Sequence, residues 1–248
     1  MSAPVVLNTR PREQAAELSH LLRQAGFEPL EAPAIEIQPA WDPFEFETAR
    51  RDLGAGVFDW VVLASQNAGS SLKTELRTNR VVCGAATARA LDVTSEFALR
   101  RFSASAALHV LGPMVRPGQY VLVPRAAAGR DELIDGLRAL GVSVSAPVAY
   151  RTVAVAPATL EQSVALLRAG GVAAITVCSP SAIASLLLAI GRGPLAQAAL
   201  ACLGESTAAA ARQANLRVAA VARKTTMESL VLAVRGALGA AEPREQAV

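Results

Sequence analysis

The sequence predicts an α/β protein made of two similar parallel-sheet domains, and three observations support this prediction. Hydrophobic residues make up 52% of the 248 residues but aromatic residues only 4%, so Ala, Val and Leu supply most of the apolar surface. Short apolar runs alternate with polar turns and helical segments, which is typical of parallel strands covered by helices. Several of these strand-helix segments occur twice, and the length suits two domains of roughly 120 residues each.

Four units recur in the same order along the chain, each about one strand and one helix long, and each is marked by a short matching segment. VVLNTR (5–10) returns as YVLVPR (120–125), FDWVVLASQNA (58–68) as VAAITVCSPSA (172–182), VCGAATARAL (82–91) as CLGESTAAAA (202–211), and FSASAALHVL (102–111) more loosely as KTTMESLVLAV (224–234). Each domain should therefore hold a parallel sheet with helices on both faces and right-handed crossovers.

Two extended runs suggest that the chain crosses between the domains twice. Residues 31–39 and 146–157 are flanked by proline and lack helical periodicity, so they read as strands. If they pair as a two-stranded β linker, domain 1 comprises residues 1–37 and 153–248 and domain 2 comprises residues 38–152. A simple tandem arrangement of the two domains is the alternative that composition leaves open.

Composition excludes several classes of protein. The net charge of +3 comes without clustered Lys and Arg, so we expect no nucleic-acid partner. Cys83, Cys178 and Cys202 lie in apolar runs as small buried residues, and with only His20 and His109 we expect no metal site.

The uncharged stretch 169–191 is long enough to cross a membrane but divides at Ser179 and Pro180. The first half reads as a buried strand and the second as a helix that Ser179 caps, with Pro180 at its first position. We therefore expect no membrane partner. The N-terminus lacks the layout of a signal peptide, and we expect a cytoplasmic protein.

Polar residues gather where the predicted strands end, which is where parallel sheets bind ligands. The candidate substrate-binding residues there are Thr9, Arg10, Ser65, Asn67, Gly84, Thr87, Arg125, Ser179, Ser181, Gly204, Ser206 and Thr207. Ser65, Ser179, Ser206 and Thr225 occupy N-cap positions, and capping alone is the simplest interpretation of each. Several helix N-termini together would also present N–H groups to carboxylates. Gly84 and Gly204 would let the backbone turn tightly and approach a ligand.

The remaining candidates are three arginines and a tyrosine. Arg10, Arg125 and Arg130 could bind carboxylates in a bidentate manner, although any single one could equally be a solvated surface residue. Tyr150, in VAYRTV, could donate a proton near a cleft, or could serve only as a strand aromatic. Tyr120, at the start of a strand, is expected to be structural.

Together, these segments resemble the uroporphyrinogen-III synthase family over residues 5–236. The resemblance rests on the order and spacing of LNTRPREQAAELSHLLRQAG, FDWVVLAS, CGAATARAL, PRAAAGRDELIDGLRALG, VAYRTV, CSPSA and GESTAAAARQANLRV. Tyr150 matches the family tyrosine favoured as the acid for the leaving hydroxyl. Ser179, Ser181, Ser206 and Thr207 match segments that bind substrate through hydroxyls and amides. Ser206 replaces the commoner Thr, and Thr225 stands where many members have Pro.

The resemblance implies two α/β domains joined by a two-stranded linker, with the active site in the cleft between them. It implies that the substrate is hydroxymethylbilane, an octacarboxylate, which closes to uroporphyrinogen III with loss of water and inversion of ring D through a spiro intermediate. It implies no cofactor, and we expect a monomer. The bilane also closes without enzyme to the type I ring, so positioning should matter more than any single acid or base.

Two other functions remain as alternatives. A non-catalytic two-lobed protein could close on a small anion, but the sequence shows neither a DNA-binding nor a receiver segment. A nucleotide-dependent transferase could use the glycine turns for phosphate. The sequence has no P-loop lysine and no acidic metal cluster, which disfavours that alternative.

Overall fold

The chain divides into two compact units in the computed structural model, which describes residues 3–39, 42–77, 79–99 and 102–239. Unit 1 comprises Met1–Glu36 and Val153–Val248, and unit 2 comprises Ile37–Thr152. Each unit contains a five-stranded sheet, and the registered pairs within both sheets are parallel. The predicted α/β class with two similar parallel sheets is confirmed.

Unit 1 is built on the strand order β13-β12-β11-β1-β2. Its strands are β1 (Val5–Asn8), β2 (Glu28–Glu31), β11 (Ala174–Val177), β12 (Ala199–Cys202) and β13 (Val218–Val221). Its helices are α1 (Ala15–Gln24), α8 (Glu161–Arg168), α9 (Pro180–Ile190), α10 (Arg192–Leu195), α11 (Glu205–Gln213) and α12 (Met227–Ala237), with 3-10 turns at Arg12–Gln14 and Pro157–Leu160.

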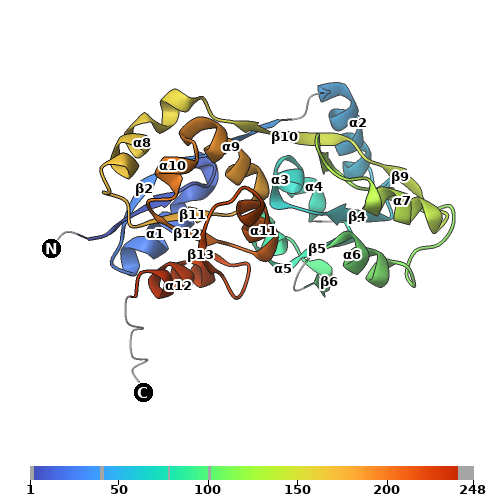
Figure 1. Cartoon of the computed structure of the whole chain (residues 1–248). Helices are drawn as coiled ribbons and strands as arrows, with labels where there is room; N and C mark the ends of the chain where they lie inside the picture. The colour runs from blue at the N-terminus through green and yellow to red at the C-terminus, as the bar shows by residue number, and fades with distance from the viewer. Residues whose placement is uncertain (1–2, 40–41, 78, 100–101, 240–248) are drawn as a thin grey trace, which may run out of the picture. The chain divides into compact units, whose positions relative to one another are not determined.

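Alternate residues along these strands face opposite layers of helices, as the two-residue repeat of a strand requires. On β1, Leu7 packs with residues of α8, α9 and α11, whereas Val6 packs with residues of α1 and α12. Figure 1 shows α8, α9 and α10 on one side of this sheet and α1 and α12 on the other. The sheet is therefore covered by helices on both faces, and in sheets of this kind ligands bind beyond the carboxyl ends of the strands.

Unit 2 repeats this construction with the strand order β6-β5-β4-β7-β9. Its strands are β4 (Trp60–Leu63), β5 (Val81–Gly84), β6 (Ser95–Leu99), β7 (Tyr120–Leu122) and β9 (Ser143–Ser145). Its helices are α2 (Pro43–Gly54), α3 (Gln66–Gly69), α4 (Lys73–Leu76), α5 (Ala85–Leu91), α6 (Ala104–Leu111) and α7 (Glu132–Ala139), with a 3-10 turn at Ser70–Leu72.

The repeated sequence segments occupy equivalent places in the two sheets. The matching segments 5–10 and 120–125 contain β1 and β7, and each of these strands is fourth in the order of its sheet. In the same way, β11 and β4 are both third, and β12 and β5 are both second. The weakest match in unit 2 is the short helical stretch after β4, where α3, a 3-10 turn and α4 replace the single long helix α9 of unit 1.

A third sheet has the order β3-β10-β8 and contains β3 (Ile35–Pro39), β8 (Arg125–Ala126) and β10 (Val148–Ala154). Both extended runs predicted from the sequence contribute to it, and the division between the units falls within β3 and β10. The sheet differs from the predicted two-stranded arrangement by its third strand, β8, which pairs in parallel with β10. Residues 28–31 form β2 in the unit 1 sheet, so the first extended run is interrupted before β3.

The membrane-length stretch folds as the sequence predicts. β11 occupies Ala174–Val177, and α9 begins at Pro180 with Ser179 as its N-cap. Among the described helices, none is both long enough and apolar enough to cross a membrane.

Candidate functional site

Ser65, which follows the carboxyl end of β4, meets Tyr150 of β10, a strand of the three-stranded sheet. Ser65 Oγ and Tyr150 Oη lie 3.0 Å apart, within hydrogen-bond distance. Ser65 directly precedes α3, with an extended backbone at φ −152° and ψ 159°, and its Oγ also accepts the Ala68 N–H at 3.4 Å. One hydroxyl therefore caps a short helix and contacts the phenol of a distant strand.

Tyr150 is fixed both by packing of its side chain and by hydrogen bonding of its backbone. Its partly buried ring packs against the apolar cluster that includes Phe58, Leu63 and Ala149. Its backbone lies in β10, where Tyr150 pairs with Ala126 of β8. The Ala127 N–H donates to the Tyr150 carbonyl at 2.9 Å. The phenol therefore reaches Ser65 from a fixed position within unit 2.

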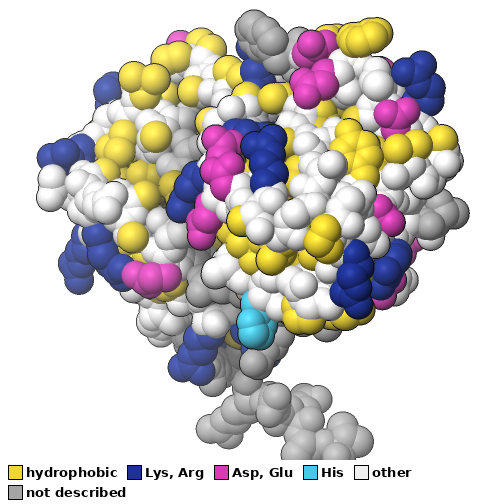
Figure 2. Space-filling model, turned by 90° about the vertical axis from the view of Figure 1, so that its right-hand side faces the viewer, with side chains coloured by type: hydrophobic (Ala, Val, Ile, Leu, Met, Phe, Trp, Pro, Cys, Tyr) yellow, Lys and Arg dark blue, Asp and Glu magenta, His cyan; other side chains and the backbone are white. Residues whose placement is uncertain are grey.

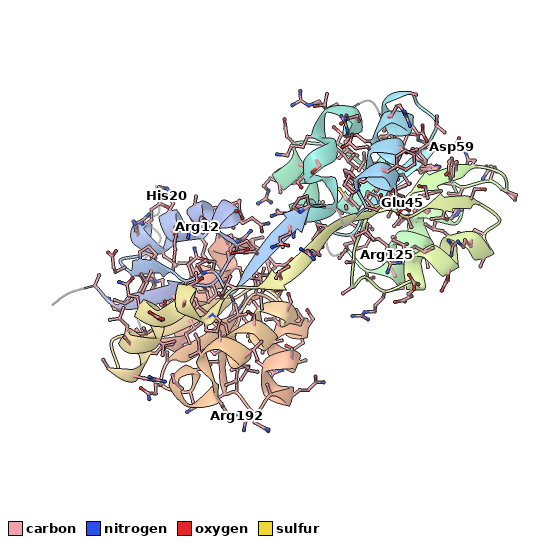
Figure 3. All side chains as sticks on the ribbon, turned by 90° about the horizontal axis from the view of Figure 1, so that it is seen from above. Arg12, His20, Glu45, Asp59, Arg125 and Arg192 are labelled. Carbon is pink, nitrogen blue, oxygen red and sulfur yellow. The ribbon has the colours of Figure 1, made fainter. Side chains whose placement is uncertain are left out.

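Arg125 organises the loop that follows β8. Its guanidinium forms an ion pair with Asp131 and donates to the Gly129 carbonyl, while its Nε donates to the Ala126 carbonyl at 3.4 Å. Figure 3 shows Arg125 beside the ribbon of β10. Arg130, in the same loop, is exposed, and no described residue is a hydrogen-bond or ion-pair partner of its side chain.

In unit 1 the end of β1 is anchored by buried polar side chains. Thr9 is 2% exposed, and its hydroxyl donates to the Thr176 carbonyl at 2.6 Å. Asn8 is fully buried and donates to the Ala15 carbonyl and to Ser19 Oγ, each at 2.9 Å, while its Oδ1 accepts the Arg10 N–H at 3.2 Å. These contacts fix the turn from which the Arg10 side chain projects.

Arg10 itself is partly buried. Its guanidinium donates to Gln14 Oε1 at 3.1 Å and lies 2.7 Å from Met227 Sδ at the start of α12. The Nε atom is buried and has no hydrogen-bond partner among the described residues. An anion at this edge of the sheet could supply the partner that this donor lacks.

The predicted N-caps of unit 1 are confirmed at Ser179 and corrected near α12. Ser179 Oγ accepts the Ala182 N–H at 3.2 Å and lies 3.0 Å from Ser181 Oγ. Thr226, rather than Thr225, caps α12, because its backbone is extended and its hydroxyl accepts the Ser229 N–H at 3.3 Å. Ser206 also differs from the predicted N-cap, because α11 begins at Glu205 and Gly204 is its cap residue.

The glycine turns do not use the left-handed conformation. Gly84 and Gly204 are the cap residues of α5 and α11, with φ values of −73° and −161°. At Gly84 an added Cβ would lie 3.3 Å from Phe102 Cβ, so close packing favours glycine there. Of the nearby candidates, Ser206 is exposed, Thr87 and Asn67 are partly exposed, and Thr207 is buried.

The three cysteines are free thiols, and the predicted burial is confirmed for Cys83 and Cys202, whereas Cys178 is only partly buried. Burial raises the pKa of Cys178 and of Cys202 to about 11 and also raises the pKa of Cys83. Their thiolate forms are therefore suppressed near neutral pH, which does not suit a nucleophile. Among the described residues, no group of three His, Cys, Asp or Glu side chains is arranged to hold a metal ion.

Surface charges are mixed on the face that Figure 2 draws, where basic side chains lie beside acidic ones in several places. Ion pairs such as Arg50–Glu75 and Arg80–Glu96 also join oppositely charged side chains within unit 2. Carboxylate binding would therefore depend on individually placed arginines and helix N-termini.

Of the site residues that the sequence predicts, Ser65 and Tyr150 lie together, and Arg125 lies on the strand that pairs with β10. Asn8 and Asp131, which hold the turns at two strand ends, are not among the predicted residues. Asp131 follows Arg130 directly, and the GRDE segment could have suggested an ion pair that closes the loop. The burial of Asn8 at the end of an apolar strand depends on long-range packing, which carries no local signal.

Comparisons with a family model, with related sequences and with solved structures all point to one family. A family model described as uroporphyrinogen-III synthase HemD matches residues 16–232. The porphyrin biosynthesis protein HemD of Ruminiclostridium josui is 26% identical over 240 residues, which cover 91% of this chain and 47% of that protein. The chain thus spans about half the length of that relative.

In two further comparisons the matched region covers most of this chain and most of the other protein. A putative uroporphyrinogen-III synthase of Methanothermobacter thermautotrophicus is 31% identical over 199 residues, which cover 74% of this chain and 76% of that protein. A crystal structure of a mutant uroporphyrinogen III synthase from the extremely thermophilic bacterium Thermus thermophilus has a TM-score of 0.61 at 19% identity, covering 96% of this chain and 99% of that chain. At that identity the structural match shows a shared fold.

Proposed function

The chain belongs to the uroporphyrinogen-III synthase family, whose members are cyclising hydro-lyases of porphyrin biosynthesis acting on a tetrapyrrole, and we propose how its residues carry out this reaction. The substrate is hydroxymethylbilane and the product is uroporphyrinogen III. The observation that supports this proposal most directly is the hydrogen bond between Ser65 and Tyr150 at the carboxyl end of the unit 2 sheet.

Tyr150 acts as the acid for the leaving hydroxyl. Its phenol donates a proton as the carbon–oxygen bond breaks, so that water leaves and an azafulvene remains. Ser65 Oγ, 3.0 Å away, can then donate to the phenolate oxygen and stabilise its negative charge. The substituted carbon of ring D attacks the electrophilic methylene carbon of the azafulvene, and the resulting spiro intermediate fragments and recloses with ring D inverted. The final loss of a ring proton restores the phenol.

Substrate carboxylates bind at the strand ends of both sheets. In unit 1, Arg10 offers a buried Nε without a protein partner among the described residues, and the start of α9 carries the paired hydroxyls of Ser179 and Ser181. The remaining members of the proposed set are Thr9, Asn67, Gly84, Thr87, Arg125, Arg130, Gly204, Ser206 and Thr207. For the buried Thr9 and Thr207 we propose a supporting role, because the Thr9 hydroxyl and the Thr207 N–H already bond within the unit.

The same proposal includes the domain bounds, the cellular location, the oligomeric state and the absence of a cofactor. The domains are residues 1–37 with 153–248 and residues 38–152, with linker strands near 31–39 and 146–157. The protein acts as a cytoplasmic monomer, needs no cofactor and binds no nucleic acid. Analytical ultracentrifugation with and without bilane tests the oligomeric state.

An isomer assay tests the function. Hydroxymethylbilane is supplied, the products are oxidised, and type I and type III uroporphyrin are separated by chromatography. We expect mainly type III. If only type I forms, as in a control without protein, the chain would instead be a non-catalytic binding protein with this fold.

A further inference from the structure

Residues 125–131, which comprise β8 and the turn after it and are called the loop 125–131 here, connect Arg125 to the backbone of Tyr150. The exposed side chain of Arg130 in the same loop has no partner among the described residues. Arg125 contacts three groups of its own loop, namely the Asp131 carboxylate and the carbonyls of Gly129 and Ala126. A guanidinium suits this role because its planar fork donates in several fixed directions at once. The Arg125 side chain is 23% exposed, so little of it remains for a ligand.

The loop is also tightly closed. The Gly129 N–H donates to the Ala126 carbonyl at 2.9 Å, which forms a turn over Ala127 and Ala128. A Cβ on Gly129 would lie 3.0 Å from the Ala126 oxygen and 3.4 Å from Arg125 Nε. Glycine therefore allows the guanidinium to lie against the turn.

The closed loop is bonded directly to the strand that carries the phenol. Ala126 pairs with Tyr150, and the Ala127 N–H donates to the Tyr150 carbonyl at 2.9 Å. The Arg125 N–H donates to the Pro147 carbonyl at 3.0 Å, just before β10. A change in the turn would thus shift the backbone of Tyr150 relative to Ser65.

We infer that Arg125 is a positioning residue for Tyr150, and that Arg130 supplies the charge with which this loop binds a substrate carboxylate. The ion pair with Asp131 neutralises Arg125, whereas the exposed Arg130 side chain has no partner among the described residues. This assignment rests on the proposed function of Tyr150 as the acid. It separates two arginines that the sequence treats alike.

A double-mutant cycle with the whole protein and hydroxymethylbilane tests the role of Arg125. Arg125→Gln should lower kcat by ~10-fold or more, because small misplacements of a catalytic group are costly. In a Tyr150→Phe background the same change should have little further effect, since its consequence is transmitted through the phenol. An equal loss of kcat in both backgrounds would overturn the assignment.

Gly129→Ala provides a second test if Arg125→Gln fails to fold. It keeps both arginines but crowds the turn, and it should reproduce the loss of kcat in the wild-type background only. Unchanged kcat for Tyr150→Phe alone would refute Tyr150 as the acid. The positioning role of Arg125 would fail in a different way. In that case Tyr150→Phe alone would lower kcat, and Arg125→Gln would lower kcat by the same factor again in the Tyr150→Phe background.

The role of Arg130 has a different kinetic signature. Arg130→Gln should raise KM by about 10-fold, with a much smaller change in kcat, because it removes a charge-assisted bond that substrate and transition state share. Arg138→Gln, which removes an exposed arginine paired with Asp135 on α7, is the matched control and should leave KM unchanged. A larger rise of KM in Arg125→Gln than in Arg130→Gln would contradict the assignment.

Discussion

The hydroxyls of Ser65 and Tyr150 lie 3.0 Å apart although 85 positions separate the two residues in the sequence. Ser65 comes from the turn after β4, and Tyr150 comes from β10, so neither local segment alone defines the pair. The contact gives the Ser65 hydroxyl a second partner besides the N–H that it caps, and it gives the phenol a fixed direction.

Ser65→Ala and Ser103→Ala separate capping from catalysis. Both serines are N-caps, Ser65 of α3 and Ser103 of α6, and each accepts an N–H three residues later. Each substitution should lower the free energy of unfolding by about 1 kcal/mol or less. Only Ser65→Ala should also lower kcat, which a bilane assay measures. Equal kcat values for the two variants would show that Ser65 only caps its helix.

Asn8→Ala should destabilise the protein strongly. The substitution leaves the Ala15 carbonyl, Ser19 Oγ and the Arg10 N–H without their buried partner. We expect a loss of roughly 2–3 kcal/mol in the free energy of unfolding, measured by urea denaturation. Gln24→Ala, at an exposed position of the helix that carries Ser19, is the control. An equally small effect for both substitutions would disprove the role of Asn8.

The position of the α12 N-cap predicts that alanine substitutions at the adjacent Thr225 and Thr226 change the stability of the protein by different amounts. Thr226→Ala removes the hydroxyl that accepts the Ser229 N–H and should cost about 1 kcal/mol of stability. The exposed Thr225 has an identical side chain, and Thr225→Ala should have almost no effect on thermal unfolding. The reverse order would place the cap at Thr225, as the sequence suggested.

The raised pKa values of the cysteines predict how the stability of the folded protein changes at alkaline pH. Burial holds the pKa of Cys178 and Cys202 near 11, above the ordinary value of 9.0 expected in the unfolded chain. Between pH 9 and about 11 the unfolded state loses these protons while the folded state keeps them. The unfolded state is therefore favoured progressively over this range, so the protein should lose stability as the pH rises from 9 towards 11.

Urea denaturation at a series of pH values from about 8 to about 11 measures this loss, and a free energy of unfolding that does not fall over that range would contradict it. Thiol labelling at about pH 8, below the ordinary pKa of a thiol, separately tests how accessible the thiols are. The native protein should react slowly with a maleimide, and addition of urea should expose all three thiols. Rapid labelling of the folded protein at the buried Cys202, or at Cys178, whose pKa desolvation raises, would contradict this expectation.

The sequence predicts the parts of the fold that depend on local patterns. The run Trp60–Leu63 is apolar throughout, as a strand buried on both faces must be, and the Ser179-Pro180 pair marks a helix start. It does not predict β8, because Arg125–Ala126 has no periodicity and becomes a strand only by pairing with β10. For the same reason it leaves Arg125 as a surface cation, although its partners lie in its own loop. The shift from Thr225 to Thr226 reflects the usual uncertainty of helix boundaries.

The most direct test of Tyr150 as the acid is the rate at which Tyr150→Phe forms type III uroporphyrinogen from hydroxymethylbilane. Tyr120→Phe is the matched control, since Tyr120 lies at the start of β7 and packs against Phe58. We predict that Tyr150→Phe slows turnover by at least ~10-fold, the lower range for losing a positioned acid being ~100-fold, while Tyr120→Phe retains the wild-type rate. Equal turnover by Tyr150→Phe and the wild-type protein would contradict the account and return Tyr150 to a structural role.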